Sequence, residues 1–189
     1  MFPIHGKFPK EMAIIGRILL DYGELELDLM NCVQVARNRD MNSTLKAMFR
    51  SRGELSRIQI ADALGRVPYT ALGMGAEFEM MIEAMDHCRK IRNKYAHAYW
   101  HDPNMGKELC YVSLEELAGE DGPVNDLTNL TFFFIDEPLL LRQEAYFEFV
   151  RSLIMYLNYE GRVRTKEIRH HGMSMPTALQ KPPYFTRKG

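Results

Sequence analysis

The chain has 189 residues, of which 46% are hydrophobic and 26% are charged, and its formal net charge is −1 at neutral pH. A chain of this length and apolar content is expected to fold around one core rather than remain disordered. The near-neutral charge excludes the uniformly basic surface of a dedicated nucleic-acid-binding module, so any contact with nucleic acid is expected to be local.

The sequence carries no sign of export or membrane insertion. The first twelve residues have no apolar run behind a basic start, so no secretory signal is expected. The most hydrophobic later stretch, residues 127–141, contains two acidic residues and a proline and is too short to span a bilayer. The cysteines are too far apart for a disulfide framework or a metal-binding pair: Cys32, Cys88 and Cys110. We therefore expect a cytoplasmic protein with no membrane partner.

The N-terminal half is expected to be helical. Apolar residues recur at three- and four-residue spacing over residues 9–37, which predicts a long first helix. Two shorter helices are expected to follow, one over residues 43–50 with Ser43 as its cap, and one over residues 55–64 that stops near Pro68.

Two further helices are predicted from amphipathic patterns. Residues 78–100 have a strongly amphipathic pattern, and Pro103 is expected to end that helix. Asp136 is expected to cap a last helix that begins near Pro138 and either ends near Gly161 or continues, with a break, towards Gly172. Together with the first helix they suggest a bundle.

The remaining segments are not helical in pattern. Residues 108–113 and 130–135 are rich in strand formers and are separated by the polar segment 119–129, which predicts a small antiparallel hairpin. Residues 172–189 contain three prolines and are expected to form an extended or disordered arm. The predicted fold is therefore mainly α: one helical domain over residues 1–171 with a small β-hairpin, followed by the C-terminal arm.

The C-terminal end is the basic end of the chain. Between Glu160 and Gly189 there are seven Lys and Arg residues against two acidic residues. Such cations can complement the dipole at a helix C-terminus, or they can bind phosphate groups. The candidates for phosphate binding follow the predicted last helix: Arg162, Arg164 and Lys166.

The segment 89–100 holds the residues best suited to chemistry. Two aromatic residues end it, as is common after the histidine in one family of helical ribonucleases. The residues before them resemble the Arg-polar-x-x-x-His signature of that family, the HEPN domains: Arg92, Asn93, Ala96 and His97.

The HEPN resemblance implies a helical bundle that acts as an endoribonuclease without a metal or cofactor. The ribose 2′-hydroxyl would attack the adjacent phosphate and leave a 2′,3′-cyclic phosphate. His97 would be the general base or acid, because an imidazole titrates near neutral pH. Arg92 would stabilise charge on the phosphoryl oxygens, and Asn93 would orient the histidine or the phosphate. Lys90 and Lys94 would add contacts to the RNA.

The spacing of the motif bears on its partners. On a straight helix Asn93 and His97 lie about 40° apart, whereas Arg92 and His97 lie about 140° apart. A kink, or a second copy related by a twofold axis, would be needed to bring Arg92 and His97 together, so we expect a homodimer. RNA is the expected substrate. One hypothesis is that the protein is a toxin or defence effector whose activity is held down by an inhibitory protein partner.

A purely structural interpretation of the motif is also possible. Arg92 would then pair with an acidic residue of the first helix, such as Glu24 or Asp28, and His97 would lie on a solvated face. This interpretation arises because, on a straight helix, Arg92 falls on the same side as a stripe of apolar residues: Met81, Met85, Cys88, Tyr95 and Tyr99.

Three other interpretations concern different residues or the whole chain. His97, His101 and Asp102 could be metal ligands, although no Glu lies within their spacing as in zinc proteases. His170 and His171 are expected to be solvated rather than ligands. The whole chain could be a catalytically silent HEPN-like module that binds protein or RNA, or a structural helical protein that matches the motif by coincidence.

Overall fold

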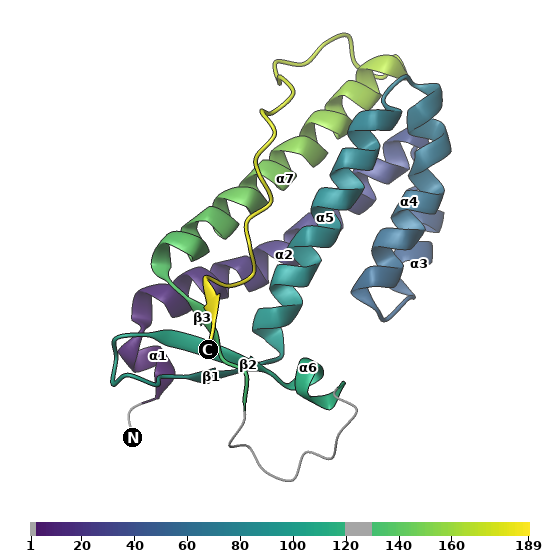
Figure 1. Ribbon diagram of the computed structural model, residues 1–189. Helices are drawn as coiled ribbons and strands as arrows, with labels where there is room; N and C mark the ends of the chain where they lie inside the picture. The colour runs from purple at the N-terminus through teal and green to yellow at the C-terminus, as the bar shows by residue number, and fades with distance from the viewer. Residues whose placement is uncertain (1–2, 120–129) are drawn as a thin grey trace. The chain divides into compact units, whose positions relative to one another are not determined.

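The computed structural model describes residues 3–119 and 130–189. These residues form seven helices and a four-stranded antiparallel sheet, which confirms the mainly α prediction (Figure 1). The helices are α1 (Ile4–Lys7), α2 (Pro9–Ala36), α3 (Met41–Phe49), α4 (Glu54–Ala71), α5 (Gly75–Ala96), α6 (Leu114–Ala118) and α7 (Glu137–Arg164). No helix in the described part of the chain is long and apolar enough to cross a membrane.

The chain divides into two compact units. The sheet unit contains residues 1–20, 90–145 and 182–189, and the helical unit contains residues 21–89 and 146–181. Helices α2, α5 and α7 contribute residues to both units.

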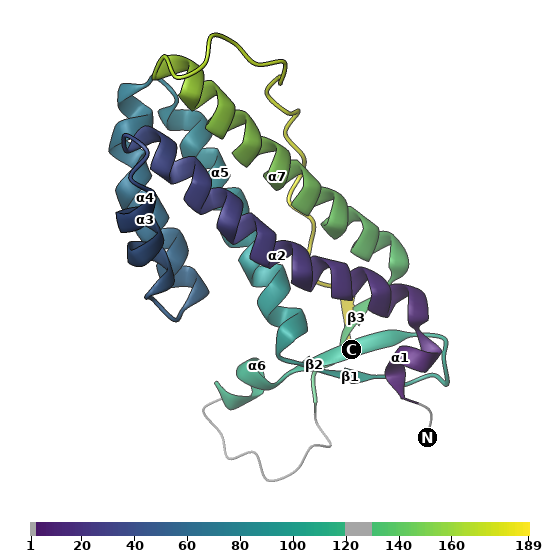
Figure 2. The ribbon, with the colours of Figure 1, turned by 180° about the vertical axis from the view of Figure 1, so that it is seen from behind.

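The helical unit confirms two short helices but changes their boundaries. Helix α3 is capped by Asp40 rather than by Ser43, because the Asp40 carboxylate accepts the Ser43 amide at 3.0 Å. Helix α4 continues through Pro68 to Ala71 instead of stopping there. Pro68 has no N–H to donate to the carbonyl four residues earlier. Tyr69 is fully buried, and this burial stabilises the last turn in place of that bond. Figures 1 and 2 show α3 and α4 side by side.

An aromatic stack lies at the centre of the helical unit. The rings of Tyr69 and Phe78 are 4.7 Å apart and nearly parallel. The Tyr69 hydroxyl donates to the Cys32 carbonyl at 2.9 Å, and burial raises the pKa of the Cys32 thiol to about 12. Met81 and Met85 are also fully buried, whereas the neighbouring Met80 is 39% exposed.

The sheet contains the predicted hairpin and two strands that were not predicted. Strand β2 (Leu109–Ser113) pairs antiparallel with β3 (Phe133–Ile135), which confirms the hairpin. Most of its expected connection, residues 120–129, lies outside the described residues. The edges are β1 (Ala98–His101), paired with β2, and β4 (Arg187–Lys188), paired with β3.

Strand β1 overturns the prediction that one helix extends over residues 78–100. Helix α5 ends at Ala96, and the following residues pair with β2 in the register Tyr99 to Val112 and Trp100 to Tyr111. Aromatic residues favour strands, and the Trp100 and Tyr111 rings lie 5.6 Å apart on one face of the sheet. Pairing with β2 therefore decides the conformation of residues 98–101, although their spacing continues the helical pattern.

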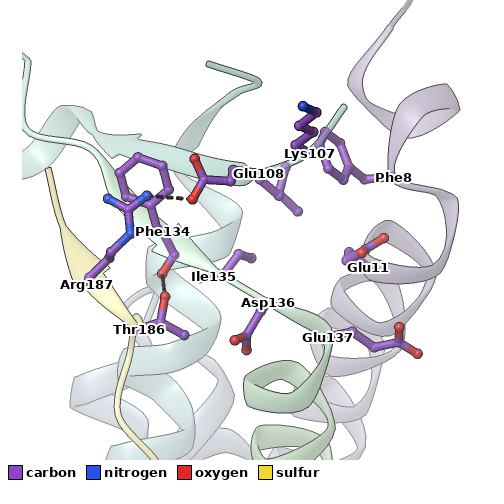
Figure 3. Close-up of a pocket in the computed structure, with 11 residues that line it drawn as sticks. Phe8, Glu11, Lys107, Glu108, Phe134, Ile135, Asp136, Glu137, Thr186 and Arg187 are labelled. Atoms are coloured by element: carbon purple, nitrogen blue, oxygen red, sulfur yellow. Dashed lines mark hydrogen bonds and ion pairs between the residues drawn. The ribbon is translucent and has the colours of Figure 1, made fainter. Parts of the chain in front are cut away.

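The end of the C-terminal arm is the fourth strand. The Gly189 and Phe132 backbones exchange two hydrogen bonds of 3.0 Å, and the Thr186 amide donates to the Phe134 carbonyl at 2.7 Å. Figure 3 shows Arg187 bonded to Glu108, at 2.6 Å, with its guanidinium over the Phe134 ring. The arm before it, residues 172–181, has no regular secondary structure.

Helix α7 begins as predicted and ends slightly later. Asp136 caps it by accepting the Leu139 amide at 2.8 Å, and the helix runs to Arg164 rather than ending near Gly161. The prediction that His171 is solvated is wrong, because its imidazole bonds Glu160 at 2.9 Å and is only 9% exposed. His170 is exposed as predicted.

Candidate functional site

The C-terminal turns of α5 hold the motif in place through buried neighbours. Ile91 and Tyr95 are buried on one side of the helix. The Tyr95 hydroxyl donates to the Gln143 side-chain oxygen at 2.5 Å, and Gln143 in turn donates to the Pro183 carbonyl at 2.7 Å. Gln143 therefore fastens α5 and the end of the arm to α7. Burial raises the pKa of the Tyr95 hydroxyl, which keeps it a neutral donor.

The motif residues lie at the junction of α5 and β1. Arg92 donates from Nη1 to the Asn93 side-chain oxygen at 3.0 Å. The His97 amide donates to the Asn93 carbonyl at 3.2 Å, which keeps His97 one helical turn above Asn93. The His97 side chain is exposed and has no hydrogen bond or ion pair with residues 3–119 or 130–189. Such an imidazole is accessible to a substrate.

Arg92 is less buried in the structure than the helical periodicity predicts. Its side chain is half-buried rather than part of the apolar stripe, because Ile91 and Tyr95 occupy the buried side of this turn. Of the two acidic residues of the structural interpretation, Glu24 accepts a hydrogen bond from Arg151 at 2.7 Å. Burial raises the pKa of the other, Asp28.

The candidate RNA-binding lysines lie on the same helix as the motif. Lys90 is exposed. The Lys94 ammonium bonds Glu116 at 2.7 Å and lies 5.5 Å from the centre of the Tyr184 ring. Lys94 must therefore exchange a partner to bind a phosphate group.

The three basic residues proposed for phosphate binding belong to the helical unit, where Arg162 and Arg164 lie in the last turn of α7 rather than after the last helix. Arg162 bonds Asn158 at 2.9 Å and Glu167 at 3.1 Å. Arg164 donates to the carbonyl of Leu72 at 2.6 Å and also bonds Glu160, while Lys166 is exposed. Arg162 and Arg164 thus neutralise acids and carbonyls at helix ends.

The metal interpretation required His97 and His101 to lie on one helix, and they do not. His97 follows the last turn of α5, whereas His101 is the last residue of β1. The Asp102 carboxylate accepts the Gly106 amide at 2.7 Å and pairs with Lys7 at 2.6 Å, and these bonds lower its pKa. Within the described ranges, no group of three or more His, Cys, Asp or Glu residues is arranged to hold a metal ion.

Two supporting features could not be anticipated from spacing. Gln143 lies 48 residues from Tyr95, and Lys7 lies 95 residues from Asp102. A glutamine on the apolar face of a predicted helix is a weak signal of a buried polar contact. No such signal marks Lys7.

No protein-family model, curated protein or solved structure matches this chain. The functional argument therefore depends on the motif and its geometry.

Proposed function

We propose that the chain is a cytoplasmic, HEPN-like endoribonuclease that cleaves RNA without a metal ion. The observation that carries this proposal is the junction of α5 and β1, where an exposed His97 imidazole lies one turn above a hydrogen-bonded Arg92–Asn93 pair. A general base, a cation and an orienting amide are the groups that phosphodiester transesterification uses.

In the proposed reaction, His97 removes the proton from the ribose 2′-hydroxyl. The 2′-oxygen bonds to phosphorus, the bond from phosphorus to the 5′-oxygen breaks, and that oxygen takes up a proton. The products are a 2′,3′-cyclic phosphate and a 5′-hydroxyl. Arg92 stabilises the charge on the phosphoryl oxygens, since a guanidinium binds such oxygens through paired N–H donors.

Incubation with a single-stranded RNA of mixed sequence tests this proposal. We expect fragments that end in a 2′,3′-cyclic phosphate, formed at the same rate in excess chelator, because an imidazole and a guanidinium carry the reaction. Mass spectrometry of the fragment ends provides the measurement. Loss of cleavage in chelator that zinc or manganese restores would favour metal chemistry instead.

We also propose that the active form is a homodimer in which one copy supplies Arg92 and the other His97. Arg92→Ala and His97→Ala proteins, each inactive alone, should then recover activity when they are mixed and allowed to exchange subunits. Half of the dimers would be mixed, each with one intact site, so about a quarter of the wild-type rate is expected. A mixture that stays inactive would contradict the shared site. Sedimentation that shows only monomer at tens of micromolar would contradict it as well.

A catalytically silent RNA- or protein-binding module is the second candidate. The cations near the motif and at the end of α7 favour it, although several of them already bond acids of the same chain, such as Lys94 with Glu116. The cleavage experiment separates the two candidates.

A further inference from the structure

A cavity of about 360 Å³ lies beside β1, the strand that follows the candidate catalytic residue His97 in the chain. All of its lining residues belong to the sheet unit. Helix α1 and the strand contribute most of the wall: Ile4, Lys7, Tyr99, Trp100, His101 and Asp102.

The wall of this cavity is largely aromatic and partly preorganised. Trp100 is held between Tyr95 and Tyr111, whose ring centres are each 5.6 Å from its own. Tyr99 is 59% exposed, although it lies in a paired strand. Successive side chains of a strand lie on opposite faces, so Trp100 packs against Tyr95 and Tyr111 while the Tyr99 ring stays available to a flat ligand. Aromatic rings stack on the faces of nucleobases.

The polar groups of the cavity suit a nucleotide. Lys7 and Asp102 both line the cavity and pair at 2.6 Å, so the ammonium is fixed at the wall as a hydrogen-bond donor whose charge the carboxylate balances. Strand β1 is an edge of the sheet, so alternate residues direct backbone N–H and C=O groups away from β2. Such groups can bond the edge of a base.

The position of the cavity relates it to the proposed reaction. Tyr99 and His101 follow His97 by two and four residues in an extended chain, which places them about 7–13 Å further along. A nucleotide adjacent to the scissile phosphate can reach that far.

We propose that this cavity holds the base of a nucleotide next to the cleaved bond, so that the substrate is single-stranded RNA. This inference rests on the proposed function, because only that function identifies the ligand as RNA. A base inside a duplex is stacked on its neighbours, whereas an unpaired base can turn out and stack on Tyr99 at the edge of the cavity that Trp100 also lines. The cavity therefore selects single strands.

Trp100 is the only tryptophan of the chain, so its fluorescence reports on the cavity in the unmodified protein. Titration with an uncleavable single-stranded 2′-O-methyl RNA of six nucleotides should quench this fluorescence to saturation. The same sequence as a blunt duplex should bind at least tenfold more weakly, because its bases are not available for stacking.

Tyr99→Ala should weaken binding of the single strand about tenfold, as expected for the loss of one stacking ring, and Tyr99→Phe should retain it. Leu141→Ala is the matched control, because Leu141 is 47% exposed in the same unit and does not line the cavity. It should bind like the wild type, and circular dichroism should show all three variants folded.

The outcomes for the cavity and for catalysis are distinguishable. Quenching that depends on Tyr99, without any RNA cleavage, would support the base site and overturn the nuclease. Cleavage without quenching, or with binding unchanged in Tyr99→Ala, would overturn the base site alone. Equal binding of the duplex, or quenching by an extended peptide and not by RNA, would also overturn it.

Discussion

Replacement of His97 by alanine should lower the rate of RNA cleavage about 10²–10⁴-fold, the usual contribution of a general acid or base. The fold should remain intact, because the His97 side chain is exposed and contacts none of the described residues by hydrogen bond or ion pair. Exposed substitutions of this kind change the free energy of unfolding by less than about 0.5 kcal/mol, which corresponds to about 2 °C in Tm.

The rate should be measured in single turnover with protein in excess, so that weaker binding does not hide a loss of chemistry. The control is His170→Ala, which removes another exposed imidazole from the helical unit and should cleave like the wild type. If His97→Ala protein cleaves RNA at the wild-type rate, His97 has no catalytic role and the binding module becomes the better account.

Replacement of Gly65 by alanine should destabilise the helical unit by about 1–3 kcal/mol, the usual cost of forcing extra volume into a packed core. A Cβ at Gly65 would lie 2.8 Å from Cε2 of the Phe78 ring and closer still to its Cζ. The ring cannot easily move away, because it stacks on Tyr69 and both rings are fully buried. Urea unfolding should show the loss as a lower midpoint.

Gly23→Ala is the matched control, because Gly23 is also inside a helix of the same unit but a Cβ there meets nothing within 4 Å. This change should raise the free energy of unfolding by about 0.5–1 kcal/mol, since alanine loses less backbone entropy than glycine on folding. If Gly65→Ala lowers the free energy of unfolding and Gly23→Ala raises it, the loss in Gly65→Ala comes from packing against Phe78. A stabilised Gly65→Ala protein would contradict the packing of this core.

The long helices and the hairpin could be predicted from local pattern. Helices α2 and α7 begin where their apolar spacing or cap predicts, α5 begins three residues earlier than predicted, and β2 and β3 pair as their strand formers indicate. The relation of Asn93 to His97 was also predictable, because an i to i+4 spacing depends only on helix geometry. Local periodicity and capping are encoded within a few residues.

The surroundings of the site depended on residues far apart in the chain. The strand at Ala98–His101 exists because β2 pairs with it, although the same residues continue a helical pattern. Lys7 meets Asp102, and Gln143 meets Tyr95, through contacts that no spacing encodes.

The sequence by itself therefore determined the helical class of the fold and the motif at the end of α5. The tertiary structure alone decided where that helix ends, which cations are already paired and where a cavity opens beside the motif. The physical reason is that strand pairing, ion pairing and burial depend on neighbours brought together by folding, whereas helical periodicity depends on residues within a turn or two.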